Sequence, residues 1–432
     1  MKLCMIGTGY VGLVSGVCFS DVGNKVYCVD KDQKKIDLLN KGIVPIYEPG
    51  LQEILRKNYK QKNLIFTSDL TEAVINSDII FICVGTPTKK NSNSADLKYV
   101  FSVAKDLKKI IKKYKIIITK STVPVSTGDQ IERILGNLKK KKLVDIVSNP
   151  EFLREGEAIR DFVFPDRVII GTDSKKANKI LKSLYLPIIK KNSRYFNTSR
   201  RGAELIKYAS NAFLASKISF INEMANLCEK AGVNIKDVSM GMGSDQRIGD
   251  RFLRAGPAYG GSCFPKDTRA LIDIGNKFKT NLSIVKSVVN SNENRKSLLT
   301  KKVEKILGHN LKNKNITFLG VTFKPNTDDM REASSIPMIK YLNKKNSKIK
   351  YFDPSGEKED FKSLKNVNYC STISSACYKA DLVILHTEWN EFKLLDFKKL
   401  IKKNKFKIYD MRNLYSPSKM KRLNINYFSI GR

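Results

Sequence analysis

The feature that most constrains the fold is a short apolar strand that runs directly into a glycine-rich turn at the amino terminus. Residues 2–6, Lys-Leu-Cys-Met-Ile, precede the run Gly7-Thr-Gly-Tyr-Val-Gly12, and a helical pattern follows to about Gly23. A second predicted strand, residues 25–30, ends at Asp30, eighteen positions after Gly12. Strand, glycines, helix, strand and terminal carboxylate together predict a βαβ unit that binds a dinucleotide.

Each defined position of this motif has a physical role. Gly7 allows the tight turn, Gly9 allows the pyrophosphate to approach the backbone, and Gly12 allows the helix to pack closely on the strand. The helix start presents N–H groups to the phosphates. The Asp30 carboxylate can accept hydrogen bonds from the ribose hydroxyls and would repel a 2′-phosphate, which favours NAD over NADP, although two nearby lysines, Lys31 and Lys35, pull the other way.

The rest of the chain continues an α/β pattern in two parts around a long helix. Further strands are predicted at residues 79–84, 115–119, 144–148, 167–172, 316–320, 348–353, 381–386 and 405–410. A proline-free helical pattern runs from 203 to 231 and stops at Gly232, and a second helix is predicted at 335–342. We predict two Rossmann-like, doubly wound parallel-sheet domains joined by a central helical domain, with bounds 1–200, 201–305 and 306–432. The third domain lacks the full glycine motif.

Composition indicates a multidomain enzyme rather than a nucleic-acid reader. The 432 residues are 41% hydrophobic and carry a net charge of +37. The lysines are spread over helices and loops, the pattern of a solvated surface, so no nucleic-acid partner is expected, but the field favours an anionic substrate. No segment offers about 18 to 20 uninterrupted apolar residues, so we predict no membrane span and a cytoplasmic location.

The cysteines and histidines narrow the chemistry. Eight cysteines show no CxxC spacing and the chain has two histidines, so neither a zinc site nor a disulfide framework is indicated, and we predict no metal. Cys263 stands apart because it lies in Gly260-Gly-Ser-Cys-Phe-Pro-Lys-Asp267, which places a thiol, an ammonium and a carboxylate on a glycine loop. Lys266 can favour the nucleophilic thiolate, so Cys263 is the candidate nucleophile. The other seven cysteines are interpreted as small buried hydrophobic residues.

Further reactive groups lie at strand ends and on the long helix. Glu151 and Glu155 follow the strand 144–148 and would share one face if their segment is helical. Lys207 and Asn211 are four residues apart on the long helix, and so also share a face, although a helical lysine is usually a solvated surface group. Thr86 and Thr122 follow two further strands, where hydroxyls can meet cofactor or water.

A family resemblance rests on these motifs together. The chain resembles the UDP-glucose/GDP-mannose dehydrogenase family from Gly7-Thr-Gly-Tyr-Val-Gly-Leu-Val14 to Asp410-Met-Arg412. Other matching segments are Lys120-Ser-Thr-Val-Pro124, Ser148-Asn-Pro-Glu-Phe-Leu153, Glu204-Leu-Ile-Lys-Tyr-Ala-Ser-Asn-Ala-Phe213, Gln246-Arg-Ile-Gly249, the loop around Cys263, and Phe323-Lys324.

The resemblance implies a four-electron oxidation of C6 of UDP-glucose to a carboxylate with two NAD molecules in turn. Cys263 would form a thiohemiacetal with the intermediate aldehyde, and its oxidation would give a thioester that water hydrolyses. By similarity, Lys207 and Asn211 stabilise the developing oxyanion and position water. Asp267 would orient or deprotonate water, Glu151 is a further acid or base, and Thr122 anchors a water.

The resemblance also implies two binding sets and an assembly. The cofactor set is Gly7, Gly9, Val11, Gly12, Asp30, Lys35, Thr86, Thr122, Glu155, Lys266 and Arg331. The nucleotide-sugar set is Glu151, Phe152, Leu153, Glu155, Lys207, Asn211, Arg247, Phe252, Leu253, Arg254, Ala255, Gly256, Gly260, Phe323, Lys324 and Arg412. Arg247 resembles a residue that reaches across a subunit interface, so a homodimer or higher homo-oligomer is expected.

Two alternatives remain open at this point. A sister enzyme that acts on UDP-N-acetylmannosamine or GDP-mannose would share the cysteine, lysine and glycine motifs. A polyanion-binding protein that uses the basic surface would keep the catalytic motifs only as vestiges, and the presence of Cys263, Lys207 and Asp267 together counts against it.

Overall fold

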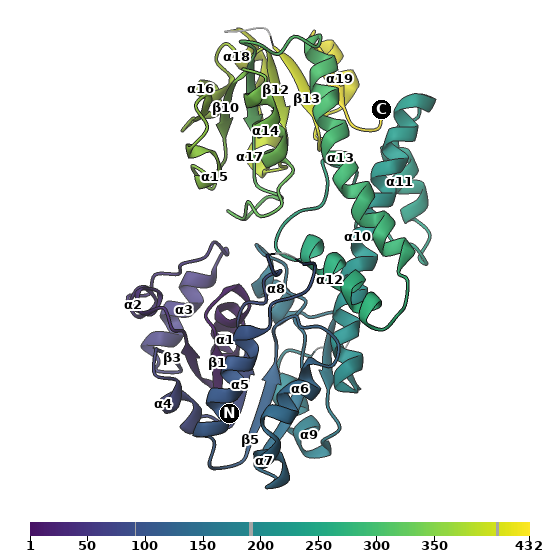
Figure 1. Ribbon diagram of the computed structural model, residues 1–432. Coiled ribbons are helices and arrows are strands. Elements are labelled where there is room, and N and C mark those ends of the chain that lie inside the picture. Colours follow the sequence, from purple (N-terminus) through teal and green to yellow (C-terminus); the bar gives the residue numbers. More distant parts are fainter. Residues whose placement is uncertain (91, 190–192, 403–405) are drawn as a thin grey trace. The chain divides into compact units, whose positions relative to one another are not determined.

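The computed structural model describes residues 1–90, 92–189, 193–402 and 406–432, and the chain divides into two compact units. The first unit contains Met1–Ser210 and Asp273–Thr280, and the second contains Asn211–Ile272 and Asn281–Arg432. The two predicted sheets fall one in each unit, and the predicted long helix is present as α10, Arg200–Ala231 (Figure 1). The predicted fold class is therefore confirmed, while the exact domain bounds stay a prediction.

The first unit is built on an eight-stranded sheet of order β3-β2-β1-β4-β5-β6-β7-β8. The strands are β1 Lys2–Ile6, β2 Lys25–Val29, β3 Leu64–Thr67, β4 Ile79–Ile82, β5 Lys115–Thr119, β6 Val144–Ser148, β7 Arg167–Gly171 and β8 Arg194–Thr198. The first six are parallel, in the order typical of dinucleotide-binding folds. One pairing departs from the parallel pattern, because β7 runs antiparallel to β6.

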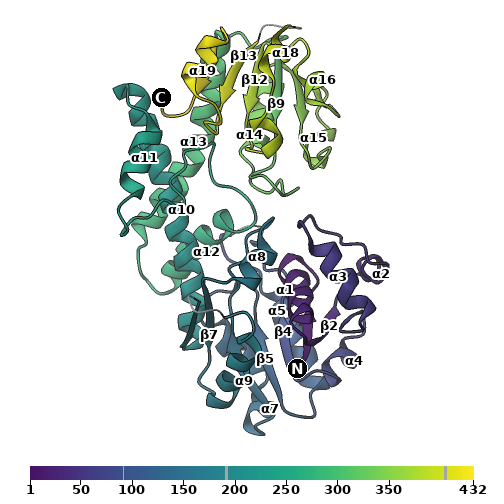
Figure 2. The ribbon, with the colours of Figure 1, turned by 180° about the vertical axis from the view of Figure 1, so that it is seen from behind.

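Helices cover both faces of this sheet (Figures 1 and 2). They are α1 Tyr10–Asp21, α2 Gln33–Asn40, α3 Leu51–Lys60, α4 Leu70–Ile75, α5 Lys98–Ile110, α6 Thr127–Ile134, α7 Gly136–Lys140, α8 Ala158–Val163 and α9 Lys175–Tyr185. Because side chains alternate along a strand, Leu3 and Met5 of β1 join the core under α1, α3, α8 and α9, whereas Cys4 and Ile6 join the core under α4, α5, α6 and α7. Burial on both faces explains the continuous apolar runs that made the central strands recognisable.

The second unit contains a six-stranded, wholly parallel sheet of order β11-β10-β9-β12-β13-β14. Its strands are β9 Asn315–Leu319, β10 Lys348–Phe352, β11 Val367–Tyr369, β12 Leu382–Leu385, β13 Lys407–Asp410 and β14 Tyr427–Ser429. The strand order again matches the complete six-stranded order of dinucleotide-binding folds. Lys405, the first residue of the predicted strand 405–410, lies outside the described residues.

The remaining helices lie wholly or mostly in the second unit. They are α11 Ile235–Gly243, α12 Phe264–Lys277, α13 Ser283–Leu307, α14 Ser335–Lys344, α15 Glu359–Lys362, α16 Ile373–Cys377, α17 Asn390–Lys393, α18 Phe397–Lys402 and α19 Pro417–Arg422. The carboxyl-terminal part of α10 lies beside α13 (Figures 1 and 2) and is tied to it by buried polar groups. The Arg295 guanidinium of α13 donates to Asn222 O at 3.0 Å and to Asn226 Oδ1 at 2.8 Å.

None of the described helices combines the length and the apolar composition needed to cross a bilayer.

We predict that Gly12→Ala destabilises the first unit by about 3 kcal/mol, because a Cβ at Gly12 would lie 1.9 Å from the carbonyl oxygen of Gly7. Urea unfolding followed by circular dichroism measures this. Gly136→Ala is the matched control, since its Cβ would meet nothing within 4 Å. Equal unfolding midpoints for the two variants would contradict the close packing of α1 on the turn.

Candidate active site

The glycine motif of the first unit forms an open cradle at the start of α1. Gly7 has a φ of +101°, which only glycine adopts easily, and its N–H donates to Val29 O at 2.7 Å. A Cβ at Gly9 would meet nothing within 4 Å, so the backbone there faces open space. The first turn of α1 carries no acidic residue and no side-chain cap. These features fit the pyrophosphate of NAD, which helix N–H groups would hold.

Asp30 closes β2 and holds the glycine turn in place. Its Oδ2 accepts from Thr8 N at 2.9 Å and from Thr8 Oγ1 at 2.7 Å, and the Lys35 ammonium lies 3.2 Å away. Burial raises the pKa of the Asp30 carboxyl, but the Thr8 hydrogen bonds and the Lys35 charge outweigh burial and leave the pKa below its ordinary value. The group is therefore ionised at neutral pH, as a ribose acceptor needs to be.

Thr86 and Thr122 are joined across the carboxyl edge of the sheet. The Thr86 hydroxyl donates to Thr122 O at 2.8 Å. Thr86 follows β4 and Thr122 follows β5, and these strands are neighbours in the sheet. The structure thus brings together two residues of the predicted cofactor set, at the edge where doubly wound folds bind ligands.

The segment after β6 is a loop, so the condition under which Glu151 and Glu155 would share a helical face is not met. Residues 149–157 form no helix, and α8 begins at Ala158. Glu151 Oε2 accepts from Leu153 N at 2.6 Å, which closes a tight turn within the loop. The Glu151 carboxylate thus accepts a hydrogen bond from the backbone of its own loop. This bond fixes the turn after Pro150, where no helix forms.

Lys207 is buried, contrary to what a helical lysine usually does. Its side chain is 4% exposed, and its Nζ lies 3.3 Å from Glu151 Oε1, which is equally buried. The ammonium also lies 5.0 Å from the centre of the Phe152 ring. An ammonium out of water is costly without a partner, so this carboxylate and this ring offset its desolvation.

The glycine loop of the second unit presents Cys263 immediately before α12. Gly261 has a φ of +80°, and its N–H donates to Arg331 O at 2.8 Å. Cβ atoms at Gly260 and Gly261 would each lie 2.6 Å from another group, the Glu332 carbonyl oxygen and the Phe323 ring respectively. Both glycines are therefore required by close packing, and the packing leaves Cys263 half-buried rather than buried.

The other cysteines are buried except Cys370, which is half-buried because it follows the short edge strand β11. The interpretation of all seven as buried is therefore wrong for Cys370.

Asp267 is the most enclosed group of the second unit's predicted catalytic set. It is 0% exposed, and its Oδ2 accepts from Asn211 Nδ2 at 2.6 Å. Its Oδ1 accepts from the Lys266 ammonium at 2.5 Å. Its backbone N–H donates to Cys263 O at 2.8 Å, so the Asp267 carboxylate and the Cys263 thiol belong to one hydrogen-bonded turn.

The predicted nucleotide-sugar residues of the second unit fall into two groups. Phe252 has a φ of +67°, and Gly256 donates from its N–H to Asn222 Oδ1 at 2.8 Å, so the loop 252–256 is held against α10. Arg412 donates to His386 O at 2.8 Å and to Phe323 O at 3.2 Å, at the carboxyl edge of the sheet. A Cβ at Gly256 would lie 2.9 Å from the Arg412 guanidinium, so loop and edge meet.

Four further predicted residues are more exposed. The Arg331 guanidinium pairs with Asp329 at 2.8 Å, and the Arg247 guanidinium pairs with Asp245 at 2.6 Å. Arg254 is exposed, and Lys324 lies 5.6 Å from the centre of the Phe323 ring.

Several polar residues around these sites were missed by sequence reasoning. Glu48 accepts from Gly156 N at 2.6 Å and from Ala158 N at 2.8 Å, which caps α8 and fixes the loop after β6. The Lys120 ammonium, whose pKa is lowered by burial, lies 3.4 Å from Asn149 Oδ1. Glu204 caps α6 from α10. Their partners are distant in the chain, so no local spacing identifies them.

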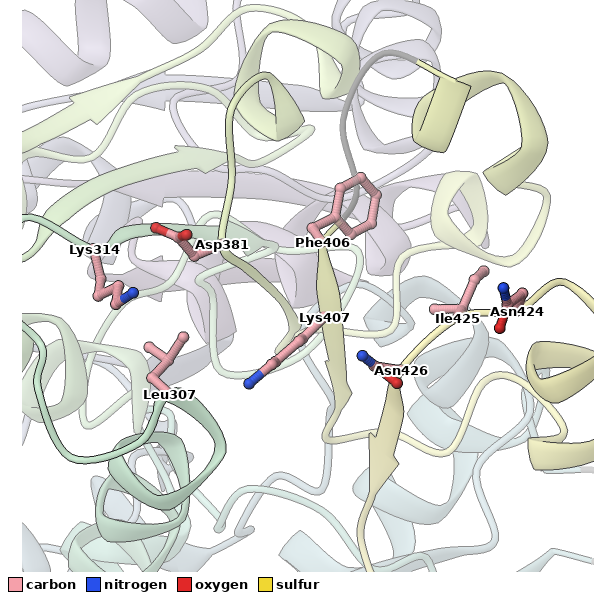
Figure 3. Close-up of a pocket in the computed structure, with 8 residues that line it drawn as sticks. All are labelled: Leu307, Lys314, Asp381, Phe406, Lys407, Asn424, Ile425 and Asn426. Carbon is pink, nitrogen blue, oxygen red and sulfur yellow. The ribbon is translucent and has the colours of Figure 1, made fainter.

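A cavity of about 280 Å³ lies elsewhere, at the amino edge of the second sheet (Figure 3). Lys314, Asp381 and Asn426 each precede a strand there. The Lys407 ammonium donates to Ile306 O at 2.6 Å and the Asp381 carboxylate accepts from Asn315 N at 2.8 Å. The cavity contains none of the predicted catalytic residues and lies at the edge opposite to the one where such folds bind ligands.

No group of three or more His, Cys, Asp or Glu side chains in the part of the chain that the structure describes is placed to hold a metal ion.

Three domain models of one protein family match the chain in sequence. They are the UDP-glucose/GDP-mannose dehydrogenase family NAD binding domain over residues 1–189, the central domain over 201–294 and the UDP binding domain over 317–417.

Relatives and solved structures match over essentially the full length. A protein of Rhizobium meliloti (strain 1021) named UDP-glucose 6-dehydrogenase is 46% identical over 100% of both chains. The structure of a UDP-glucose dehydrogenase from Pyrobaculum islandicum is 34% identical, with a TM-score of 0.90 over 99% of this chain and 96% of that one. The UDP-N-acetyl-mannosamine dehydrogenase Cap5O from Staphylococcus aureus is 25% identical, with a TM-score of 0.83 over 100% and 98%.

We predict that Gly261→Ala displaces the Cys263 loop, because the new methyl group would lie 2.6 Å from the Phe323 ring at a φ of +80°. Alkylation of Cys263 by iodoacetamide, followed by mass spectrometry, should become severalfold faster. Gly249→Ala is the matched control, since Gly249 has a φ of +68° but open space around its Cβ. If Gly261→Ala alkylates no faster than Gly249→Ala, the Phe323 contact does not hold the Cys263 loop.

Proposed function

The chain belongs to the UDP-glucose/GDP-mannose dehydrogenase family, and from this we propose that it oxidises C6 of UDP-glucose twice, from alcohol to carboxylate. The observation that carries the proposal is the Cys263 turn, in which a half-buried thiol precedes α12 and a buried Asp267 is held by Asn211. A thiol so placed suits an oxidation that passes through an aldehyde, because covalent capture retains the aldehyde for the second step.

Cys263 carries the covalent part of the proposal. NAD, when bound, accepts a hydride from C6, and two NAD molecules do so in succession. Between the two hydride transfers, the Cys263 thiolate adds to the aldehyde carbon, and the new C–S bond gives a thiohemiacetal. Loss of the second hydride leaves a thioester, and water then cleaves the C–S bond to release the carboxylate and the thiol. Each UDP-glucose thus consumes two NAD and one water.

The buried cation and carboxylate share the remaining work in this proposal. Lys207, held by Glu151 at 3.3 Å, supplies positive charge for the oxyanion, and Asn211 supplies an N–H donor. Asp267 orients or deprotonates the hydrolytic water, Glu151 is a further acid or base, and Thr122 anchors a water. The NAD-binding residues proposed in the first unit are the Gly7 to Gly12 turn with Asp30, Lys35, Thr86 and Glu155. Lys266 and Arg331 are added to them on the family resemblance alone.

The choice of sugar rests on the degree of likeness. The relative named for UDP-glucose is 46% identical over its full length, whereas the structure named for UDP-N-acetyl-mannosamine is 25% identical. We therefore propose UDP-glucose over a sister nucleotide sugar. A polyanion-binding role has no support from a built surface site, and the buried ion pair of Lys207 would serve no purpose in it. A cytoplasmic location stays a prediction.

We predict that the purified protein forms two NADH per UDP-glucose consumed and none at comparable rate with UDP-N-acetylmannosamine, UDP-galactose or GDP-mannose. The readout is absorbance of NADH against sugar loss. Two NADH from another sugar would keep the chemistry and reassign the pocket.

Cys263→Ser should lower the rate of carboxylate formation at least a hundredfold, since a serine hydroxyl is scarcely ionised at neutral pH and is a far weaker nucleophile than a thiolate. Glucuronate production at the parent rate by this variant would refute the covalent mechanism.

A homodimer is the second part of the proposal, and an exposed apolar stripe on α10 supports it. Phe213, Phe220 and Leu227 recur every seven residues and are all exposed. Such a heptad stripe is typical of a helix seam between subunits. Arg247, whose guanidinium is exposed beside Asp245, is then available to a neighbouring subunit, as the family resemblance implies.

We predict that Phe220→Glu together with Leu227→Glu yields a monomer, because two buried like charges in a symmetric seam cost more than the apolar contact returns. Sedimentation velocity at micromolar protein measures the assembly. Leu394→Glu is the control, since Leu394 is exposed at 88% but lies away from α10. A parent protein that sediments as a monomer would contradict the seam.

A further inference from the structure

We propose that Glu204 is a positioning residue for the oxidation: its carboxylate fixes the Thr122 turn, residues 122–126, beside Lys207. The inference rests on the proposed function for the part that Thr122 and Lys207 play. It adds a residue that belongs to neither set of binding residues predicted above and that acts through Thr122.

Glu204 accepts three hydrogen bonds from two elements other than its own. Its Oε2 accepts from Ser126 N at 2.7 Å, and its Oε1 accepts from Gly128 N at 2.8 Å and from Ser148 Oγ at 3.0 Å. Glu204 is on α10, Ser126 and Gly128 are at the start of α6, and Ser148 ends β6. The side chain is 3% exposed, so these bonds are shielded from water.

The start of α6 requires such an outside partner. Ser126 stands at the N-cap position, but its φ is +73° and its hydroxyl does not cap the helix. That hydroxyl instead donates to Val125 O at 2.5 Å. The first N–H groups of a helix have no partner within it, and a carboxylate also interacts favourably with the helix dipole there. Glu204 therefore supplies the cap that Ser126 cannot.

We call the hold of Glu204 on the Thr122 turn the clamp. It affects Thr122 because the turn is short and is held at both ends. At its start, the Thr86 hydroxyl donates to Thr122 O at 2.8 Å. At its end, Ser126 N is bound to Glu204, and Thr127 donates to Pro124 O at 3.1 Å from its N–H. Without the bond from Ser126 N to Glu204, the turn keeps the Thr86 bond at its other end. The backbone of Ser126, a non-glycine residue at positive φ, can then relax its strain.

A small cavity links Glu204 to the predicted catalytic groups. Glu204, Lys207 and Thr122 all line a space of about 10 Å³, roughly what one water molecule needs. Thr119 also lines it, and within the described residues its buried hydroxyl has no hydrogen-bond partner. A displacement of Glu204 therefore changes the walls that Thr122 and Lys207 share.

Burial and the hydrogen bonds to Glu204 act on its pKa in opposite directions. Burial raises the pKa of its carboxyl to about 7, against the opposing effect of the hydrogen bonds from Gly128, Ser148 and Ser126. The carboxylate, which can accept all three bonds, is therefore the favoured form only above about pH 7.

The test is a set of activity measurements on the full chain with NAD and UDP-glucose. We expect Glu204→Gln to lower kcat at least tenfold with KM for UDP-glucose changed less than threefold, because a misplaced catalytic group costs rate rather than binding. Glu132→Gln is the matched control: it removes a carboxylate of α6 that pairs with Arg200 at 2.7 Å and leaves the Thr122 turn intact. It should retain the parent kcat within twofold.

A double-mutant cycle separates positioning from general destabilisation. If Glu204 acts through Thr122, the kcat of Glu204→Gln in a Thr122→Ala background falls less than twofold below that of Thr122→Ala alone. A fall of tenfold in both backgrounds, or no fall in the parent background, overturns the proposal.

Two further measurements keep the inference decidable. Should Glu204→Gln fail to fold, Gly128→Ala leaves the carboxylate but places a methyl group 3.0 Å from its Oε1, and a comparable loss of kcat is expected. Hydrogen exchange of residues 122–134 should accelerate in the Glu204 variant and not in the Glu132 variant. If the parent forms no NADH from any sugar, the proposed function fails, while unchanged exchange in the Glu204 variant would refute the clamp by itself.

Discussion

The burial of the Lys207 ammonium is the constraint on which the carboxyl edge of the first unit's sheet depends. A lone ammonium out of water costs several kcal/mol, and its pairing with Glu151 repays that only because the geometry is fixed. Glu151 in turn bends its own loop by accepting from Leu153 N, and Glu48 ties the end of that loop to α8. The ion pair thus specifies a loop conformation that no helix or strand enforces. Removal of one partner leaves the other charged and buried, which is more damaging than removal of both.

In both units, a carboxylate at the end of one strand holds the turn that follows the neighbouring strand. In the first, Asp30 at the end of β2 accepts from Thr8 N in the turn after β1. In the second, Asp353 directly after β10 accepts from Val321 N at 2.8 Å in the turn after β9. Each sheet order places these strands side by side, so a carboxylate at one strand end can satisfy the N–H groups of the neighbouring turn. The second unit keeps this bracing although it lacks the full glycine motif.

How much could be predicted follows from which strands are enclosed. The predicted bounds of β1, β5 and β6 match the structure, and those of the other central strands differ by one or two residues at their ends. The strands that were missed, β3, β8, β11 and β14, are the edges of the two sheets. An edge strand is half in solvent, so β8 reads Arg-Tyr-Phe-Asn-Thr and shows no continuous apolar run.

The candidate site shows the same division. Residues in glycine loops and at strand ends could be named because their local chemistry is unusual. Glu48, Glu204 and Arg295 could not, because each acts on a backbone group far along the chain, and only the fold brings the two together.

Helix α10 explains why its own sequence is hard to interpret. Glu204, Lys207 and Asn211 follow the i, i+3, i+7 spacing of one helix face, and all three are buried. Phe213, Phe220 and Leu227 lie roughly on the opposite face and are exposed. The ordinary rule of apolar inside and polar outside is therefore broken at these positions of the helix. Buried polar groups are retained where they hold turns or charges that chemistry needs, and exposed apolar groups are retained where another surface can cover them. The helix whose pattern departs from a simple core at these positions is also the one that connects the cap of α6, the buried cation and the proposed subunit seam.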